Sequence, residues 1–223
     1  MDGVLYDSMP SHARAWQETF LSRNIPCSYE EFYLHEGRPG FSTINLVFQR
    51  TFNRQATEKE IQEIYRQKSD LFKKIDRQVL MPGIQELLEQ IKKDGLQIQI
   101  VTGSGQASLL DNLNKHFPGY FTRELMVTAY DVKHGKPHPE PYLQGLKKGG
   151  IQAHEAIVVE NAPMGVESSV AAHIYTVAVN TGPLDPTILT DAGADCLYPS
   201  VQAFADDWSS FYRKSQKDFS VSL

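Results

Sequence analysis

The spacing of apolar residues changes near residue 79 and divides the chain into two parts. Before that point apolar residues recur every three or four positions, as Ala13, Trp16 and Phe20 do, which is typical of amphipathic helices. Two capping boxes, which open further helices, are predicted by the spacings Ser28-x-x-Glu31 and Thr57-x-x-Glu60. No strand pattern occurs here, so we expect a helical domain over residues 11–78.

Beyond residue 79, short apolar segments alternate with helical patterns. Strands are predicted at 97–101, 125–129, 156–159, 175–179 and 196–198. Helices are predicted from Pro82 to Gly95 and at 107–117, 140–148, 165–172 and 201–213. Strands that alternate with helices imply right-handed crossovers and a parallel sheet. The predicted fold class is therefore α/β, a doubly wound parallel sheet built from residues 1–10 and 79–223, with the helical domain inserted.

Composition narrows the class of protein. The 223 residues are 41% hydrophobic and carry 22 basic against 27 acidic side chains, a net charge of −5, which argues against binding to a nucleic-acid backbone. No segment approaches the roughly 20 apolar residues of a membrane span, and no secretion signal is recognisable. Two cysteines make no disulfide framework, so we expect a cytoplasmic protein. We also expect a monomer.

Polar residues follow three predicted strands in succession. They are Thr102-Gly103-Ser104 after the first strand, Lys136 in the loop after the second, and Glu160-Asn161 after the third, with Asp2 and Asp7 in the opening turn. Each has a plain alternative, because a hydroxyl can cap a helix and a loop lysine is usually solvated. In open α/β sheets, however, ligands bind beyond the carboxyl ends of the strands. Hydroxyls, amides and lysine suit phosphate, and carboxylate and amide oxygens suit Mg²⁺.

This succession resembles the haloacid dehalogenase superfamily, specifically its β-phosphoglucomutase-like branch. Residues 2–8, Asp-Gly-Val-Leu-Tyr-Asp-Ser, look like the end of the first family motif, Asp-x-Asp-Gly-x-x-x-Asp-Ser. Val101-Thr102-Gly103-Ser104 is similar to the second motif, and Lys136 in Gly-Lys-Pro-His-Pro-Glu-Pro-Tyr to the third. Residues 159–166, Val-Glu-Asn-Ala-Pro-Met-Gly-Val, are similar to the fourth. The helical insertion corresponds to the family's cap domain.

The resemblance implies a mechanism and a cofactor. An aspartate would attack phosphorus to form an aspartyl-phosphate, and Asp2 would be the second aspartate, which protonates the leaving group and then activates water. Thr102 would bond the transferring phosphoryl group, and Lys136 would neutralise charge. Mg²⁺ would be held by Asp2, Asn161 and the neighbouring Glu160. Substrate contacts are expected from His12, Gly103 and Ser104.

Three departures from the family pattern matter. The nucleophilic aspartate would precede Met1, and the strand that carries it, which belongs between 97–101 and 156–159, is also missing. We hypothesise a truncated reading of a longer protein; a catalytically inactive pseudoenzyme is the alternative. Asn161 stands where a carboxylate is usual, and we expect Glu36 of the cap loop to compensate as a metal ligand, although it could equally be a solvated loop residue.

The third departure concerns the substrate. Mutases of this branch bind the far phosphate of a bisphosphorylated sugar with an arginine of the cap loop. In this sequence Gly40 stands at the equivalent position, and Arg38 is shifted in register. The Glu-Gly-Arg loop looks most like pyrophosphatase-type members. We therefore expect a Mg²⁺-dependent phosphohydrolase acting on a small phosphorylated molecule, with inorganic pyrophosphate first, β-phosphoglucomutase as the alternative enzyme, and a phosphate-binding pseudoenzyme as the alternative class. His12 could instead be a packed hinge residue, and we expect Lys68 on a solvated face.

Overall fold

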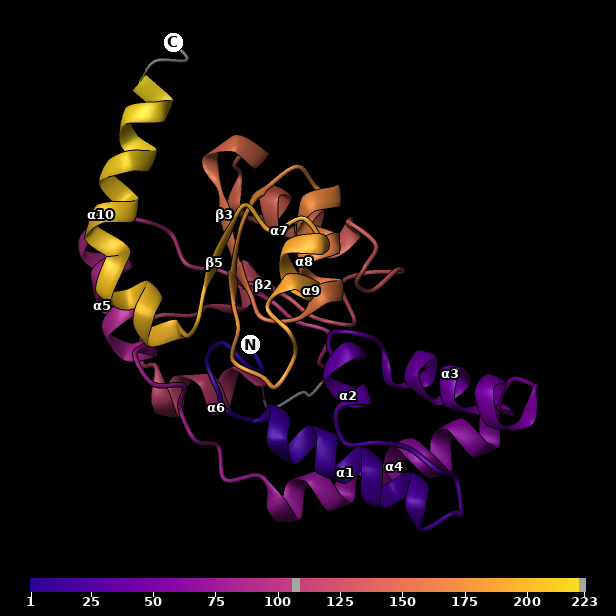
Figure 1. The fold of residues 1–223 in the computed structure, drawn as a ribbon. Helices are drawn as coiled ribbons and strands as arrows, with labels where there is room; N and C mark the ends of the chain where they lie inside the picture. Colours follow the sequence, from indigo (N-terminus) through magenta and orange to yellow (C-terminus); the bar gives the residue numbers. More distant parts are fainter. Residues whose placement is uncertain (106–108, 221–223) are drawn as a thin grey trace.

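The computed structural model describes residues 1–105 and 109–220, which form an α/β core beside a group of four helices (Figure 1). The four helices are α1 (Met9–Leu21), α2 (Glu31–Leu34), α3 (Gly40–Phe52) and α4 (Glu58–Ile75). Their apolar faces enclose a hydrophobic cluster of their own, centred on Phe20, Phe32, Ile44 and Ile64. The amphipathic spacing before residue 79 thus corresponds to helices that bury one face against each other.

The predicted capping boxes are both present. The Thr57 hydroxyl accepts a hydrogen bond from the Glu60 amide at 3.3 Å, and the Thr57 amide donates to Glu60 at 2.7 Å. Ser28 and Glu31 exchange the same two bonds, but the helix that follows has only four residues. Helix α3 was not predicted, because the breaker-rich loop before it obscured an ordinary helical spacing of Ile44, Val47 and Phe48.

The core alternates strands and helices as predicted. Its strands are β1 (Ile100–Val101), β2 (Met126–Val127), β3 (Ile157–Glu160), β4 (Tyr175–Val179) and β5 (Cys196–Tyr198). Its helices are α5 (Ile84–Lys93), α6 (Leu109–His116), α7 (Glu140–Gly149), α8 (Pro163–Ala171), α9 (Thr187–Asp191) and α10 (Val201–Ser220), with 3₁₀ turns at Arg123–Leu125 and Ala153–Glu155. Figure 1 shows α5 and α10 side by side on one face of the strands and α7, α8 and α9 on the other.

Alternate side chains of β4 point to opposite faces of the sheet. Val177 and Val179 pack with Trp208 of α10, whereas Ala178 packs with Val166 of α8 and with α9. This alternation is what a strand buried on both faces requires. Helix α10 continues seven residues past the predicted end at 213, and the predicted residues 107 and 108 of α6 lie outside the described part of the chain.

The strands form two parallel sheets rather than one. β1 pairs with β2, and β3 pairs with β4, which pairs with β5. Among the described residues no pairing joins β1 to β3. The predicted strands at 97–101 and 125–129 are too long, since only two residues of each are paired. Among the described strands β1 pairs only with β2, so the residues before Ile100 have no backbone partners that would extend the strand.

No helix in the described part of the chain combines the length and the apolar character that crossing a membrane demands.

Candidate active site

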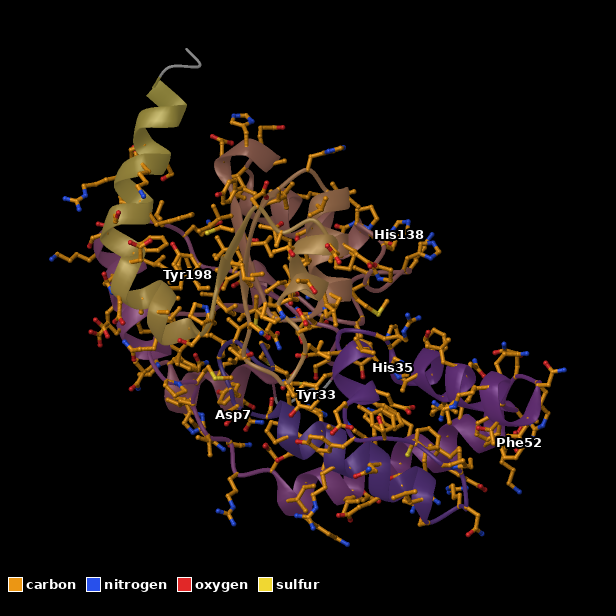
Figure 2. The ribbon with its side chains drawn as sticks, viewed as in Figure 1. Asp7, Tyr33, His35, Phe52, His138 and Tyr198 are labelled. Atoms are coloured by element: carbon orange, nitrogen blue, oxygen red, sulfur yellow. The ribbon has the colours of Figure 1, made fainter. Side chains whose placement is uncertain are left out.

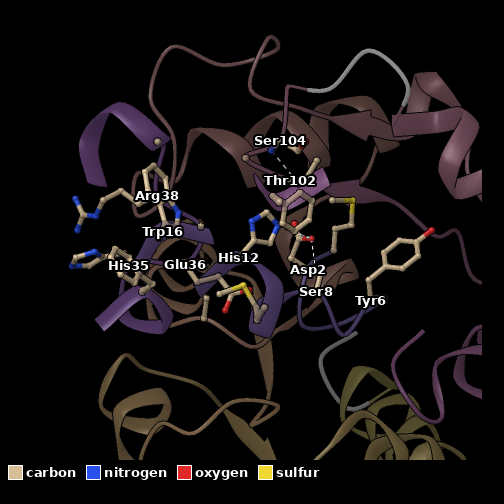
Figure 3. A pocket seen from close by; sticks show the side chains of 18 of the residues that line it. Asp2, Tyr6, Ser8, His12, Trp16, His35, Glu36, Arg38, Thr102 and Ser104 are labelled. Carbon is tan, nitrogen blue, oxygen red and sulfur yellow. Dashed lines mark hydrogen bonds and ion pairs between the residues drawn. The ribbon is translucent and has the colours of Figure 1, made fainter. Parts of the chain in front are cut away.

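A pocket of about 230 Å³ lies between the carboxyl ends of β1 and β3 and the helices α1 and α4 (Figure 3). All nine predicted site residues line this pocket: Asp2, His12, Glu36, Thr102, Gly103, Ser104, Lys136, Glu160 and Asn161. Asp7 does not, because its side chain is exposed (Figure 2). The predicted convergence at one edge of the strands is therefore present in the fold.

Asp2 is held in place by two neighbours. The Ser8 hydroxyl donates to Asp2 Oδ1 at 2.6 Å, and His12 Nε2 lies 3.5 Å from the same oxygen (Figure 3). Burial by itself would raise the pKa of the Asp2 carboxyl, but the bonds from His12 and Ser8 outweigh it and hold this pKa well below its usual range. Asp2 is therefore a carboxylate at neutral pH, oriented into the pocket.

Lys68 contradicts the expectation that it lies on a solvated face. Its side chain is only 6% exposed, and its ammonium lies 2.6 Å from His12 Nδ1 and over the rings of Trp16 and Phe72. An ammonium has no acceptor, so Nδ1 must accept this bond and the imidazole proton sits on Nε2, facing Asp2. Burial, together with Lys68, lowers the pKa of His12, and burial lowers the pKa of Lys68 to about 8.

Lys136 is positioned by Glu160 on the opposite side of the pocket. Glu160 Oε1 accepts from the Lys136 ammonium and from the Tyr142 hydroxyl at 2.6 Å, while Oε2 accepts from the backbone amide of Asn161 at 3.1 Å. Burial opposes ionisation of Glu160, but Lys136 keeps the pKa of this carboxyl below its usual value. Gly165 makes room, because a Cβ there would lie 2.1 Å from the carboxyl carbon. These bonds favour Glu160 as the residue that orients Lys136, more than as a metal ligand.

Glu36 joins the helical domain to the core. Its two carboxylate oxygens accept from Asn161 Nδ2 at 3.0 and 2.9 Å. Gly3, at φ +69°, permits this approach, because a Cβ there would lie 1.9 Å from Asn161 Nδ2. Burial, with the nearby Glu160 and Asp2 carboxylates adding to it, raises the pKa of Glu36 to about 8. Glu36 is thus not a solvated loop residue.

The loop after β1 lies beneath the same cap loop. The Ser104 amide donates to Thr102 Oγ1 at 3.1 Å, and the Thr102 amide donates to the Val127 carbonyl at 2.9 Å. A Cβ at Gly103 would come within 3.3 Å of the Gly37 carbonyl oxygen. The cap loop therefore closes over the backbone that would cradle a phosphate.

The oxygens of this pocket fit Mg²⁺ chemically. Within residues 1–105 and 109–220 no cluster of three or more His, Cys, Asp or Glu side chains has the arrangement of a metal site. Mg²⁺, however, takes few protein ligands, and carboxylate, amide and carbonyl oxygens of Asp2, Glu36 and Asn161 share the pocket. The crowding of acids that raises the pKa of Glu36 is relieved by a divalent cation, so the donor set suits a hard metal ion.

Three contributing residues were missed or misjudged by sequence reasoning. Ser8 belongs to the Asp-Ser pair of the first motif, which could have identified it. Lys68 stands four residues after Ile64 and four before Phe72, so its inward-facing position was readable from the helical period. Tyr142 ends the third motif, but its bond to Glu160, which lies 18 residues away in another element, could not be read from the sequence.

Comparisons with known proteins agree on the family. The sequence model of the haloacid dehalogenase-like hydrolases matches residues 1–179. The chain is 32% identical over 181 residues to hexitol phosphatase A of Escherichia coli K12, covering 81% of this chain and 80% of that protein. It is 24% identical over 184 residues to the pyrophosphatase PpaX of Oceanobacillus iheyensis, with 80% of each covered.

A solved structure from Bacteroides vulgatus, provisionally described as a β-phosphoglucomutase, superposes with a TM-score of 0.92 at 51% identity and covers 96% of this chain and 86% of that one. The predicted likeness to the β-phosphoglucomutase-like branch is thereby confirmed, and the doubly wound core with its helical insertion is the fold expected of it. On its sequence motifs, the matching family model and this structural likeness, the chain belongs to the haloacid dehalogenase-like hydrolases.

Proposed function

We propose that this protein is a Mg²⁺-dependent phosphohydrolase of small phosphorylated molecules, with inorganic pyrophosphate as its preferred substrate. The observation that carries the proposal is the contact between Glu36 and Asn161, which brings a carboxylate of the helical domain into a pocket of about 230 Å³. A carboxylate at this point repels a bare anion and restricts the room for a large alcohol group. It tolerates a compact substrate whose charge is neutralised by Mg²⁺.

The position of each residue in the pocket suggests its role. Asp2, Glu36 and Asn161 would hold Mg²⁺, which supplies charge neutralisation when bound. Thr102 and the backbone amides of Gly103 and Ser104 would bind the transferring phosphoryl oxygens, and Lys136 would balance their charge.

The reaction requires a carboxylate nucleophile that the family pattern places directly before Met1. Its oxygen bonds to phosphorus while the bond to the leaving phosphate breaks, and Asp2 donates a proton to that group. Water, deprotonated by Asp2, then cleaves the acyl phosphate. Asp2 is ionised, as a base must be for the second step; a phosphate dianion beside it raises the pKa of Asp2, which favours both its proton donation and its basicity.

A sugar phosphate is the second candidate substrate. It is favoured by the 51% identity to the Bacteroides vulgatus protein and the likeness to hexitol phosphatase A. A third possibility, a phosphate-binding protein without catalysis, follows if no nucleophile reaches the pocket.

The deciding experiment measures phosphate release from pyrophosphate, hexitol phosphate and β-glucose 1-phosphate at equal Mg²⁺ concentration. It compares this chain with the same chain extended before Met1 by an apolar strand that ends in aspartate. We expect pyrophosphate to give the highest kcat/KM with the extended protein. Faster isomerisation of β-glucose 1-phosphate would reject the preference for pyrophosphate, and phosphate release by the 223-residue chain alone would reject the role of the added aspartate.

A further inference from the structure

The loop between β4 and α9 is another place where the core meets the helical group (Figure 1). Leu184 of this loop packs against the hydrophobic cluster that the four helices enclose. Among the described, partly buried residues that pack against this cluster, Leu184 alone belongs to the core, and the others lie within residues 27–61. An apolar contact therefore accompanies the polar contact between Glu36 and Asn161.

Gly182 lets the same loop approach helix α2 closely. A Cβ at this glycine would lie 2.9 Å from the ring of Tyr33, a distance at which one of the two groups has to move. Tyr33 is buried in the helical cluster, and its carbonyl accepts a hydrogen bond from the Glu36 amide at 3.3 Å. The contact on Gly182 therefore restrains a short helix that ends two residues before Glu36.

The loop is braced in a way that holds this position. Asn180 Nδ2 donates to the Leu184 carbonyl at 3.1 Å and closes the loop on itself. The rings of Pro183 and Pro186 restrict the backbone on both sides of Leu184. A loop whose shape is already fixed loses little conformational entropy when its apolar residue docks, so the contact with the helical group is favoured.

The same loop also supports the backbone next to Asn161. The Thr181 hydroxyl donates to the Gly3 carbonyl at 2.7 Å. Gly3 in turn lies against the side-chain amide of Asn161. One loop thus contacts the support of each partner in the polar contact, Tyr33 on the side of Glu36 and Gly3 on the side of Asn161.

We propose that the loop over residues 180–186 is the docking site of the helical group on the core, and that Leu184 and Gly182 are positioning residues for the contact between Glu36 and Asn161. Neither residue lines the active-site pocket, so each acts through Glu36 and not on the substrate. The apolar contact supplies attraction that offsets the cost of burying a carboxylate against a neutral amide. The docking stands on these contacts alone; its effect on Mg²⁺ rests on the function proposed above.

The test follows the side-chain amide of Asn161 by NMR in the 223-residue protein. Leu184→Ala removes the docked side chain, and Gly182→Ala drives a methyl group against α2. We expect each to speed exchange of the Asn161 Nδ2 protons with water at least about fivefold, because the bond to Glu36 opens more often. Leu184→Met keeps an apolar side chain of similar volume and should keep the native exchange rate.

Two comparisons separate positioning from a loss of stability. Leu143→Ala makes the same truncation at an exposed position of α7 and should leave the exchange of Asn161 unchanged. In Leu184→Ala the backbone amides of α4 should keep their native exchange rates, because the four helices retain their own cluster. Equal acceleration in α4 would overturn the proposal, as would native exchange of Asn161 in both Leu184→Ala and Gly182→Ala.

Mg²⁺ affinity, measured by titration calorimetry, connects the docking with the proposed function. Leu184→Ala should weaken Mg²⁺ binding at least about fivefold. In a Glu36→Gln background the same change should weaken it by less than about twofold, because the side chain through which Leu184 acts is already altered. An equal loss in both backgrounds would overturn positioning through Glu36. If the exchange of Asn161 quickens while Mg²⁺ affinity stays the same, the docking stands and the proposed metal-binding role of Glu36 fails.

Discussion

At the scale of single residues, charged side chains of the pocket are held in place by hydrogen-bonded partners. Asp2 is kept ionised by Ser8 and His12, and Lys136 is kept in place by Glu160. Glu36 differs, since its carboxylate accepts hydrogen bonds from the neutral amide of Asn161, and burial raises its pKa to about 8. A carboxylate whose hydrogen-bond partner is a neutral amide is stabilised strongly by a nearby cation. A substitution of Glu36 can therefore reveal whether this side chain binds the metal ion.

Glu36→Gln should weaken Mg²⁺ binding at least about tenfold, which corresponds to about 1.4 kcal/mol. The amide keeps the size of the side chain and can still bond to Asn161, but it removes one negative charge from the pocket. Titration calorimetry with Mg²⁺ on the 223-residue chain measures the effect without requiring activity. Glu58→Gln, an exposed carboxylate at the start of α4, is the matched control. Equal affinities for the two variants would reject Glu36 as a metal ligand.

Lys68→Met should raise the pKa of His12, because burial and the neighbouring ammonium both lower it now. Methionine fills a similar volume between Trp16 and Phe72, so the fold should be retained. The His12 ring resonances followed by NMR across pH 5 to 9 report the change. Lys74→Met, an exposed position on the same helix, should leave this titration as it is. If Lys68→Met also leaves it unchanged, the bond between Lys68 and His12 does not govern the histidine.

At the scale of elements, the loop between β2 and α7 carries Lys136 and is fastened by Asp131. Asp131 Oδ2 accepts from the amide and hydroxyl of Thr128 at 2.8 and 2.6 Å, and Oδ1 accepts from Lys148 of α7 at 2.9 Å. Burial opposes ionisation, but these bonds keep the pKa of Asp131 below its usual value. One carboxylate therefore ties a strand end, a loop and a helix together.

Asp131→Asn should lower stability at pH 7 by at least about 1 kcal/mol. Because the folded pKa is depressed, the carboxylate stabilises the fold fully above its unfolded pKa of 3.8, and this stabilisation is lost as pH falls through the lower folded pKa. The difference in Tm between the two proteins should therefore narrow below about pH 4. Asp70→Asn, at an exposed position of α4, should show no such convergence. A difference in Tm between the native protein and Asp131→Asn that stays constant down to pH 3 would contradict this account.

At the scale of the whole molecule, the helical group and the α/β core have separate hydrophobic clusters. Phe20 is fully buried in the first and Leu113 in the second, and the active-site pocket lies between the two parts. We propose that the two clusters mark the predicted domains, residues 11–78 and residues 1–10 with 79–223. Polar contacts such as that between Glu36 and Asn161 would then join the two domains across the pocket.

A pair of cavity-forming substitutions tests this division. Phe20→Ala should cost about 3 to 5 kcal/mol and speed amide exchange mainly in residues 9–75, whereas Leu113→Ala should cost about 2 to 5 kcal/mol and act mainly on residues 80–213. Hydrogen exchange followed by mass spectrometry resolves the two regions. Equal acceleration of both regions by either variant would indicate one cooperative unit and reject the boundary.

The sequence by itself determined the fold class and the alternation of strands and helices in the core, and it predicted residues that converge on one pocket. Each of these depends on local chemistry: helical or strand period, capping residues, and polar side chains directly after buried strands. The carboxyl ends of parallel strands share one edge, so Thr102, Lys136 and Asn161 could be predicted to converge without knowledge of the packing. β4 and β5 also have the predicted bounds.

Only the tertiary structure decided which surfaces meet. The bond between Glu36 and Asn161 joins residues 125 positions apart, and the bond between His12 and Lys68 joins residues 56 apart. A periodic pattern shows that a face is buried but not what it is buried against, so the sequence did not predict that Lys68 packs against His12, Trp16 and Phe72. The lengths of β1 and β2 likewise depend on which of their edges pair with another strand, which no local signal in a strand encodes.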